Sequence, residues 1–250
     1  MRLLGLDLET TGLDTANDRI TELGLVLWDT DKKCLLAMKS YFMIDDGLRE
    51  KFKNPEIAAM VKRLCNLDLE TLEEFGLVPG MALSELEELA VRNKVDYILA
   101  HNGENFDKPF TYAELTRHNV KSDFFRQLPW LDTKMDIPHA TPPDSNRLRH
   151  LALDCGFINP FEHRAIFDVL TMLRVLSNYD LSEVVEYSKI PFVTVRAVVT
   201  YDDRDLAKAQ RYSWEKLGDK SFPKCWVKRI KQNKLQDEIK ACKFQVVVIN

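Results

Sequence analysis

The sequence has few features of secreted, membrane or fibrous proteins. Its five cysteines form no CxxC pair, so we expect neither a disulfide framework nor a structural zinc site. Gly and Pro account for only 9 and 10 of the 250 residues, which excludes collagen-like and low-complexity chains. No stretch approaches the roughly 20 apolar residues of a membrane helix, and the N-terminus has no signal-peptide core. We therefore expect a soluble, cytoplasmic protein without membrane partners.

The chain has enough apolar and charged residues for one sizeable domain with a small appendage. Hydrophobic residues make up 45% and charged residues 30%, as in ordinary globular proteins. The charge is uneven along the chain. Residues 194–250 hold 13 basic and 7 acidic side chains, a charge of +6, whereas residues 1–193 carry −10. This asymmetry indicates two functional parts, although a basic tail can also be only a solvated surface.

Apolar runs alternate with helical patterns up to about residue 190. The strands expected there are 2–9, 20–28, 35–43 and 95–100. The helices expected are 84–92, 109–118, 146–155 and 165–177. Three consecutive strands, followed by strands mixed with helices, predict a mixed sheet in an α/β domain. The remainder predicts a small α+β unit with strands at 193–200 and 244–249 and helical segments at 202–214 and 226–242.

The first predicted strand carries two carboxylates in the segment LDLETTGLD. Strand side chains alternate between faces, so Leu4, Leu6 and Leu8 share the core face while Asp7 and Glu9 share the other. Neighbouring carboxylates repel each other unless a cation neutralises them, and hard divalent ions suit oxygen ligands. An acid-x-acid pair arises about 6 times by chance in so acidic a chain, so alone it is also compatible with a solvated strand end.

A second acidic motif, LAHNGENFDKP, follows the predicted strand at 95–100. Pro109 suits the first position of a helix, which places Asp107 where a strand, a loop and a helix meet. Ligand sites gather at such strand ends in α/β sheets. The alternatives are that Asp107 only caps the helix, and that Phe106 fills the core instead of stacking on a base or sugar.

The third motif is EHRAIFD, at the start of a predicted helix. Asp168 lies nearly opposite the apolar stripe of that helix but is flanked by other apolar side chains, so it needs a polar partner. His163 falls in or just before the first turn, and we expect Arg164 to be exposed. The spacing His-x-Ala-x-x-Asp is expected only about 0.03 times by chance, so it is the most specific of the three motifs.

In this order the three motifs resemble those of the DEDDh-type 3′–5′ exonucleases, a family that includes the proofreading subunit of bacterial DNA polymerase III and ribonuclease T. The resemblance covers about residues 1–178, and the spacer from His101 to Asp107 is closer to that of phage-type members. It implies an RNase H-like mixed sheet flanked by helices as an exonuclease domain at 1–190. The small basic α+β domain at 194–250 resembles no family. A bacterial or phage-infected cell is the expected setting.

The resemblance also implies roles for individual residues. Two Mg²⁺ ions, for which Mn²⁺ can substitute, would be held by four carboxylates, Asp7, Glu9, Asp107 and Asp168. Two such ions stabilise charge on the attacking and leaving oxygens of a phosphodiester. His163 would act as the general base, since imidazole exchanges protons near neutral pH. Substrate contacts would come from Thr10, Gly12, Leu13, Asn102 and Phe106.

The basic C-terminal part interleaves aromatic and cationic residues, in AQRYSW and KCWVKRIK. Such a pattern suits single-stranded nucleic acid, because bases stack on aromatic rings and cations contact the phosphates. Equally, Trp214, Trp226 and Val227 could be the core of this small unit. A third reading is a docking module for a replication protein.

Three functions remain open from the sequence. The leading one is a 3′–5′ exonuclease that acts on DNA, at single-stranded or frayed 3′ ends, and releases nucleoside 5′-monophosphates. The second is the same chemistry on RNA, which contacts to the ribose 2′-hydroxyl would decide. The third is a non-catalytic nucleic-acid-binding accessory protein of replication. Four intact acids in family positions argue against the third, because a binding module has no use for them.

Overall fold

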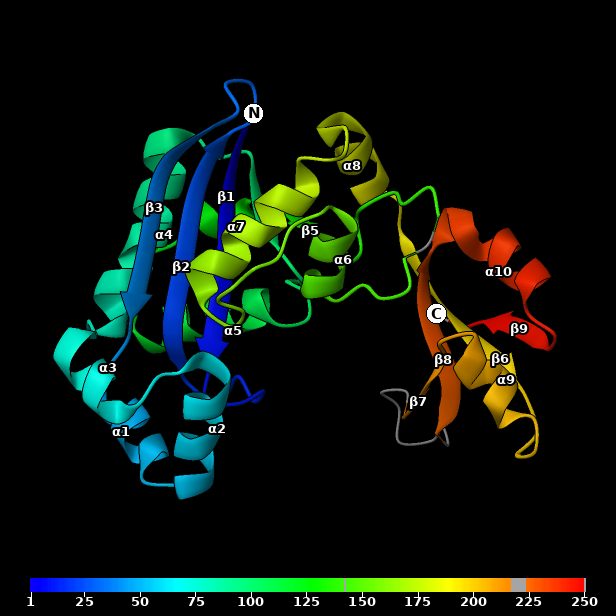
Figure 1. The fold of residues 1–250 in the computed structure, drawn as a ribbon, viewed down its shortest axis with the longest axis horizontal. Coiled ribbons are helices and arrows are strands. Elements are labelled where there is room, and N and C mark those ends of the chain that lie inside the picture. The colour runs from blue at the N-terminus through cyan, green and yellow to red at the C-terminus, as the bar shows by residue number, and fades with distance from the viewer. Residues whose placement is uncertain (142, 217–223, 250) are drawn as a thin grey trace. The chain divides into compact units, whose positions relative to one another are not determined.

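The computed structural model describes residues 1–141, 143–216 and 224–249. The chain divides into two compact units, residues 1–187 and residues 188–250, and each is described by itself. The expected C-terminal domain at 194–250 therefore includes residues 217–223 and 250, which lie outside the described residues. Figure 1 shows the elements of both units.

The first unit is built on a five-stranded sheet in the order β3-β2-β1-β4-β5. Its strands are β1 (Arg2–Thr10), β2 (Ile20–Asp29), β3 (Cys34–Phe42), β4 (Tyr97–Ala100) and β5 (Trp130–Asp132). β1, β2 and β3 pair antiparallel, whereas β4 pairs parallel to both β1 and β5. The predicted mixed sheet is therefore confirmed, and the sequence analysis missed only the three-residue strand β5.

Helices cover both faces of this sheet. On one face, α4 (Pro79–Asn93) and α5 (Asp107–Arg117) share a core with the leucines of β1. On the other, α7 (Ala165–Leu176) lies across β1 and β2 in Figure 1. Apolar side chains of α7 and of α8 (Leu181–Ser188) form a second core on this face, and α6 (Leu148–Asp154) packs beside α7. β1 is thus buried from both sides, which confirms the predicted α/β class.

Three short helices follow β3 and form a core of their own: α1 (Asp46–Phe52), α2 (Pro55–Cys65) and α3 (Leu69–Phe75). Each begins directly after a residue whose carboxylate or amide oxygen accepts a backbone N–H of the first turn, namely Asp45, Asn54 and Asp68. Such caps satisfy donors that have no partner within the helix. The cap at Asn54 fixes where α2 starts, and hence where its last residue, Cys65, lies beside β1.

The second unit contains a four-stranded antiparallel sheet in the order β7-β8-β6-β9. Its elements are β6 (Phe192–Val198), α9 (Arg204–Ala209), β7 (Ser213–Glu215), β8 (Cys225–Lys231), α10 (Leu235–Ala241) and β9 (Gln245–Val248). Buried side chains from the sheet, α9 and the segment before β7 form its core. The expected α+β character of this unit agrees with these elements.

Two expected helices of the second unit are wrong in extent. The segment 226–242 begins as strand β8 and is helical only from residue 232, first as a 3-10 turn at 232–234 and then as α10. The segment 202–214 is helical at 204–209 and ends in strand β7. β8 lies between β6 and β7 and pairs with both, so this pairing overrides the helix propensity of its lysines and arginine. None of the helices in the described ranges is long and apolar enough to cross a membrane.

Candidate active site

β1 presents its two carboxylates as the alternation predicts. Leu4, Leu6 and Leu8 lie in the core shared with α4 and α5. Asp7 and Glu9 occupy the alternate positions, on the face that α7 covers, and both are half-buried. In register, Asp7 lies opposite Gly24 and Glu9 opposite Glu22 of β2. The expected two-faced strand is therefore present.

Two glycines allow α7 to lie directly on the strands. A Cβ at Gly5 would lie 2.4 Å from Cγ1 of Val169, and a Cβ at Gly24 would lie 2.5 Å from the backbone of Ala165. Any side chain at either position would push α7 away from the sheet. The close approach of α7 at both glycines was not predicted, although a Gly inside a strand signals close approach of another backbone. Because neither glycine has a side chain, α7 lies close to the sheet, and Asp168 on α7 lies close to β1.

Asp168 lies in the first turn of α7 and is held from both carboxylate oxygens. Asn159 donates its side-chain amide to Oδ1 at 2.8 Å, and the backbone N–H of His163 donates to Oδ2 at 3.0 Å. The expectation that this acid needs polar partners is met by these two bonds. They also connect the preceding turn to the helix, which fixes where Asp168 points.

Asp107 comes from a different segment and is the most buried of the four acids. It is 1% exposed, and its Oδ1 has no hydrogen-bond partner. The helix α5 begins at Asp107, with Pro109 at its third position instead of its first. Proline has no N–H, but the N–H groups of the first helical turn have no partner within the helix. A start two residues before Pro109 therefore costs no hydrogen bond. An unpartnered buried carboxylate oxygen is a position that a cation or a water molecule could satisfy.

The four carboxylates form one electrostatic cluster. Burial raises the pKa of Asp7 well above its usual range, with further increases from the charges of Asp107 and Asp168. Burial also raises the pKa of Asp107, that of Glu9 to about 7 and that of Asp168 to about 6. Mutually repelling, partly dehydrated carboxylates are a poor arrangement for an isolated chain and a good one for divalent cations. The residues present therefore fit a metal centre.

His163 lies at the open side of this cluster. Its side chain is exposed, and its backbone adopts a left-handed conformation with φ of +61°. One ring nitrogen lies with carboxylate oxygens of Glu9 and Asp168 in a group whose atoms are all within 4.8 Å of one another. The structure thus groups His163 with Glu9 and Asp168, while Asp7 and Asp107 are tied to these acids by the charges that raise their pKa values.

Two contacts to these acids were not anticipated from the sequence. The thiol of Cys65, the last residue of α2, donates to Oε2 of Glu9 at 3.1 Å. Asp132, at the end of β5, is 3% exposed, and its negative charge contributes to the raised pKa of Asp107. Its Oδ1 accepts the backbone N–H of Asn102 at 2.8 Å. A strand of three residues has too few positions to show alternation, so β5 and its acid gave no periodic signal.

Arg164 differs from its expected exposed state. Its side chain is 30% exposed and its Nε lies 2.9 Å from Oε2 of Glu22, a carboxylate with 0% exposure. The guanidinium also lies 5.2 Å from the ring centre of Phe42. A carboxylate buried this completely needs a hydrogen-bonded partner, and Arg164 supplies it. The sequence alone did not indicate which acid would face this arginine.

The end of β1 and the loop after it carry three of the expected substrate residues. The hydroxyl of Thr10 donates to the carbonyl of Gly12 at 2.6 Å. A Cβ at Gly12 would lie 2.3 Å from the carboxylate of Asp18. This carboxylate accepts from the Asp14 backbone at 2.9 Å and so closes the loop. Leu13 is 83% exposed at the tip. An apolar side chain held out on a closed loop is free to contact a ligand.

The other two expected substrate residues lie in the loop between β4 and α5. Asn102 has a φ of +66°, and its side-chain oxygen accepts from the ammonium of Lys134 at 3.0 Å. Phe106 is half-buried, with its ring centre 5.0 Å from that of Phe110. Phe106 therefore fills part of the core and still presents some surface. Its place in the core is therefore confirmed in part, and its stacking on a base or sugar stays a prediction.

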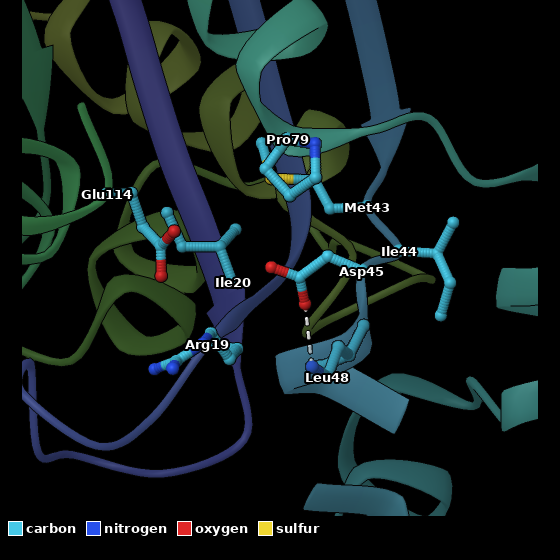
Figure 2. A pocket seen from close by; sticks show the side chains of 8 residues that line it. All are labelled: Arg19, Ile20, Met43, Ile44, Asp45, Leu48, Pro79 and Glu114. Atoms are coloured by element: carbon cyan, nitrogen blue, oxygen red, sulfur yellow. Dashed lines mark hydrogen bonds between the residues drawn. The ribbon is translucent and has the colours of Figure 1, made fainter. Parts of the chain in front are cut away.

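Two hollows in the protein surface lie near the loop after β1 without containing the carboxylates. One, shown in Figure 2, is lined by residues that include Arg19, Asp45 and Glu114, and it is too narrow for a water molecule. The second, of about 380 Å³, is lined by Arg19, Lys51, Asn54 and neighbours. Neither is bordered by Asp7, Glu9, Asp107, His163 or Asp168.

The protein without metal is expected to lose thermal stability between pH 5 and pH 8. Burial raises the pKa of Glu9 from 4.5 to about 7 and that of Asp168 from 3.8 to about 6. In this range the folded chain keeps protons that the unfolded chain has released. Their stabilising contribution is complete below about pH 4 and is lost as the pH rises through 6 to 7.

We expect the melting temperature in EDTA to fall on the order of 5 °C between these pH values, measured by scanning calorimetry. Glu9→Gln removes one of the acids with a raised pKa and should make the fall smaller. Acids with lowered pKa values, such as Asp18 and Asp68, titrate below this range and do not contribute. Burial lowers the pKa of His101 from 6.5 to about 4, so this residue opposes the fall up to about pH 6.5 and makes it smaller there. A wild-type profile that rises, or that Glu9→Gln leaves unchanged, would contradict this explanation.

Solved structures with similar folds include exonucleases bound to nucleic acids or nucleotides. Escherichia coli exonuclease I in complex with a dA16 oligonucleotide matches 98% of this chain and 68% of its own, with a TM-score of 0.63 and 12% identity. The nuclease domain of 3'hExo, a DEDDh family member bound to rAMP, matches 71% of this chain and 90% of its own, at a TM-score of 0.57 and 12% identity.

The chain is shorter than the exonuclease I structures, since it spans 48% to 68% of their length. No curated protein sequence matches it. The sequence profile of the RNase_T family, described as exonuclease, matches residues 4–176. This match includes all five residues of the carboxylate and histidine cluster, and it confirms the resemblance to DEDDh-type exonucleases. The chain belongs to the RNase T exonuclease family.

Proposed function

We propose that this protein is a divalent-metal-dependent 3′–5′ exonuclease that removes nucleoside 5′-monophosphates from single-stranded or frayed DNA ends. The observation that carries the proposal is the convergence of Asp7, Glu9, Asp107 and Asp168. Their pKa values are all raised, so together they form an environment that favours added positive charge. Membership of an exonuclease family supports the same assignment.

Mg²⁺ is the proposed ion, held by these four carboxylates. The unpartnered Oδ1 of buried Asp107 supports a ligand there, and carboxylate oxygens are the donors that Mg²⁺ prefers. Four acids match the charge of two divalent ions, so the loaded site can accept an anionic phosphodiester. When bound, such ions stabilise charge on the attacking and leaving oxygens. The chain itself orients the acids through Asn159, Cys65 and the backbone of His163.

His163 is the proposed general base. Its exposed imidazole lies beside the carboxylates of Glu9 and Asp168, where a water molecule approaching the site would pass. A ring nitrogen can take the proton of that water, and the adjacent negative charges stabilise the imidazolium that results. Because the ring faces solvent, it can also return the proton to bulk water after each cleavage.

The terminal nucleotide is proposed to lie against the two loops beside the cluster. Leu13 projects from the first loop and is suited to separate the last base from its neighbour. Thr10 and Gly12 offer backbone and hydroxyl groups nearby, while Asn102 and Phe106 border the second loop. None of these residues decides between deoxyribose and ribose. Because similar folds were solved with ssDNA and with rAMP, the exoribonuclease alternative is retained.

Digestion of matched substrates tests the function directly. DNA and RNA oligonucleotides of one sequence, labelled at the 5′ end, are incubated with the protein and Mg²⁺. We expect a ladder that shortens from the 3′ end, faster for DNA, with 5′-monophosphates as products and no cleavage in EDTA. Faster RNA shortening would favour the exoribonuclease, and no shortening of either substrate would refute the enzymatic function.

The second unit is proposed to bind the nucleic acid strand. Trp214 is 51% exposed, and its ring centre lies 5.3 Å from that of Trp226 on the next strand. The ammonium of Lys208 lies 6.0 Å from the Trp226 ring, and Arg204 lies 4.0 Å from the exposed ring of Tyr201. Exposed rings with adjacent cations suit stacked bases and their phosphates. Val227 is buried, whereas Trp214 is half exposed. Of the residues considered as a core for this unit, Val227 therefore belongs to it and Trp214 lies largely at the surface.

Trp214→Ala is expected to weaken binding of a dT oligonucleotide about 10-fold, because one stacked base contributes about 1–3 kcal/mol. Fluorescence anisotropy in EDTA measures binding without digestion. Ile239→Ala, which removes an exposed side chain from α10, serves as the matched control and should bind normally. Equal affinity of wild type and Trp214→Ala would instead favour a replication protein as the partner of this unit.

A further inference from the structure

The ion pair between Arg164 and Glu22 lies directly beside the carboxylate cluster. Glu22 is on β2, opposite Glu9 of β1, and is completely buried. Its oxygens accept from Nε of Arg164 at 2.9 Å and from the hydroxyl of Ser40 at 3.1 Å. Arg164 is the only charged group paired with Glu22 among the described residues. The pair therefore fastens the segment before α7 to the sheet.

That segment carries His163, the residue directly before Arg164. The imidazole of His163 is exposed, so packing does not fix its position. Its backbone is fixed at two points. The N–H of His163 donates to Asp168 at 3.0 Å, and the next residue is held by Glu22. A left-handed φ of +61° at His163 is costly for a residue with a side chain and persists only where the surroundings enforce it.

Arg164 has a second structural contribution, at the start of α7. Its backbone is extended, with φ of −122° and ψ of 112°, and its carbonyl accepts the N–H groups of Phe167 at 2.8 Å and Asp168 at 3.1 Å. The residue therefore joins the turn of His163 to the helix of Asp168. Its guanidinium points at Glu22 on the sheet, where it is already engaged by a carboxylate.

We propose that Arg164, through its ion pair with Glu22, is a positioning residue that holds His163 beside Glu9 and Asp168. This inference rests on the proposed function, because it assigns a device to the general base of that reaction. Arg164 is not assigned a contact with the substrate phosphate, since its guanidinium is paired with a buried carboxylate. Loss of the ion pair releases the turn that carries His163, whereas the four carboxylates proposed to bind metal are unchanged.

The test compares Arg164→Met with wild type in steady-state digestion of a DNA oligonucleotide. We expect kcat to fall about 10- to 100-fold, because displacement of a reacting group by about 1 Å has effects of this size. KM should stay within about twofold, since the substrate contacts are unchanged. Arg92→Met, which breaks an exposed ion pair with Glu88 on α4, is the matched control and should keep the wild-type rate.

A double mutant separates positioning from a general structural effect. If Arg164 acts through His163, Arg164→Met should lower kcat less than about threefold in a His163→Ala background. A full additional loss there would overturn the inference. So would an unchanged kcat in Arg164→Met, or a raised KM at normal kcat, which would indicate a substrate contact. An inactive wild type would instead refute the proposed function, so the two failures are distinguishable.

Arg164→Met leaves the buried Glu22 unpaired and can therefore unfold the chain. The double variant Glu22→Gln/Arg164→Met removes both charges and should restore a wild-type circular dichroism spectrum and cooperative melting. Its kcat should remain as low as in a folded Arg164→Met protein, because the turn is still unfastened. A folded double variant with the wild-type kcat would overturn the positioning role.

Discussion

Replacing Asp7 by Asn is expected to reduce the Mg²⁺-dependent cleavage rate by at least about 10³-fold, equivalent to about 4 kcal/mol of transition-state stabilisation. The charges of Asp107, Asp168 and Glu9 all raise the pKa of Asp7. Asparagine keeps its shape but offers no negative charge to a cation. Initial rates on a labelled oligonucleotide measure the loss.

The same substitution should stabilise the metal-free protein, which excludes misfolding as the cause. Removing one of several repelling carboxylates lowers the electrostatic cost of folding at pH 8, so the melting temperature in EDTA should rise. Asp123→Asn, at an exposed position beyond α5, is the matched control and should leave both quantities unchanged. An Asp7→Asn protein with more than a tenth of the wild-type rate would refute the metal assignment.

His163→Ala is expected to lower kcat about 10²- to 10⁴-fold, the usual contribution of a general base. Metal binding should change little, because the four carboxylates remain. Added imidazole should restore part of the rate, since it can occupy the space of the missing ring and accept the proton. Single-turnover rates, with and without imidazole, measure both effects.

The pH dependence gives a second check on His163. If the imidazole is the general base, the pH profiles of the wild type and His163→Ala should differ in shape. Restoration of the rate by imidazole should follow the neutral form of the added base. A variant within about threefold of the wild-type kcat would show that another group removes the proton.

Features encoded by local patterns could be predicted from the sequence. β1 follows the alternation of its leucines and acids, and α7 follows its apolar stripe, so the elements that carry Asp7, Glu9 and Asp168 were expected correctly. The three motifs together contain all five side chains of the cluster, so its members can be named from the sequence. Each motif combines a periodic element with an acid that the element alone does not explain.

Features that depend on contacts between distant segments could not be predicted in this way. Glu22 reads as an ordinary strand acid until Arg164 is brought beside it by the packing of α7. That packing depends on Gly5 and Gly24, whose role emerges only with the helix in place. In the second unit, β8 pairs with two neighbours and is a strand despite the helix propensity of its lysines and arginine. Side-chain periodicity does not report such pairing.

Counting bound Mn²⁺ by electron paramagnetic resonance at pH 8 tests the central claim most directly. Free Mn²⁺ gives a sharp signal that disappears on binding, so titration of the metal gives the number of sites per chain. If Asp7, Glu9, Asp107 and Asp168 form one centre, the wild type binds two ions, and Asp7→Asn and Asp107→Asn each lose saturable binding of at least one. No saturable binding by the wild type, or binding by both variants equal to that of the wild type, would contradict the account.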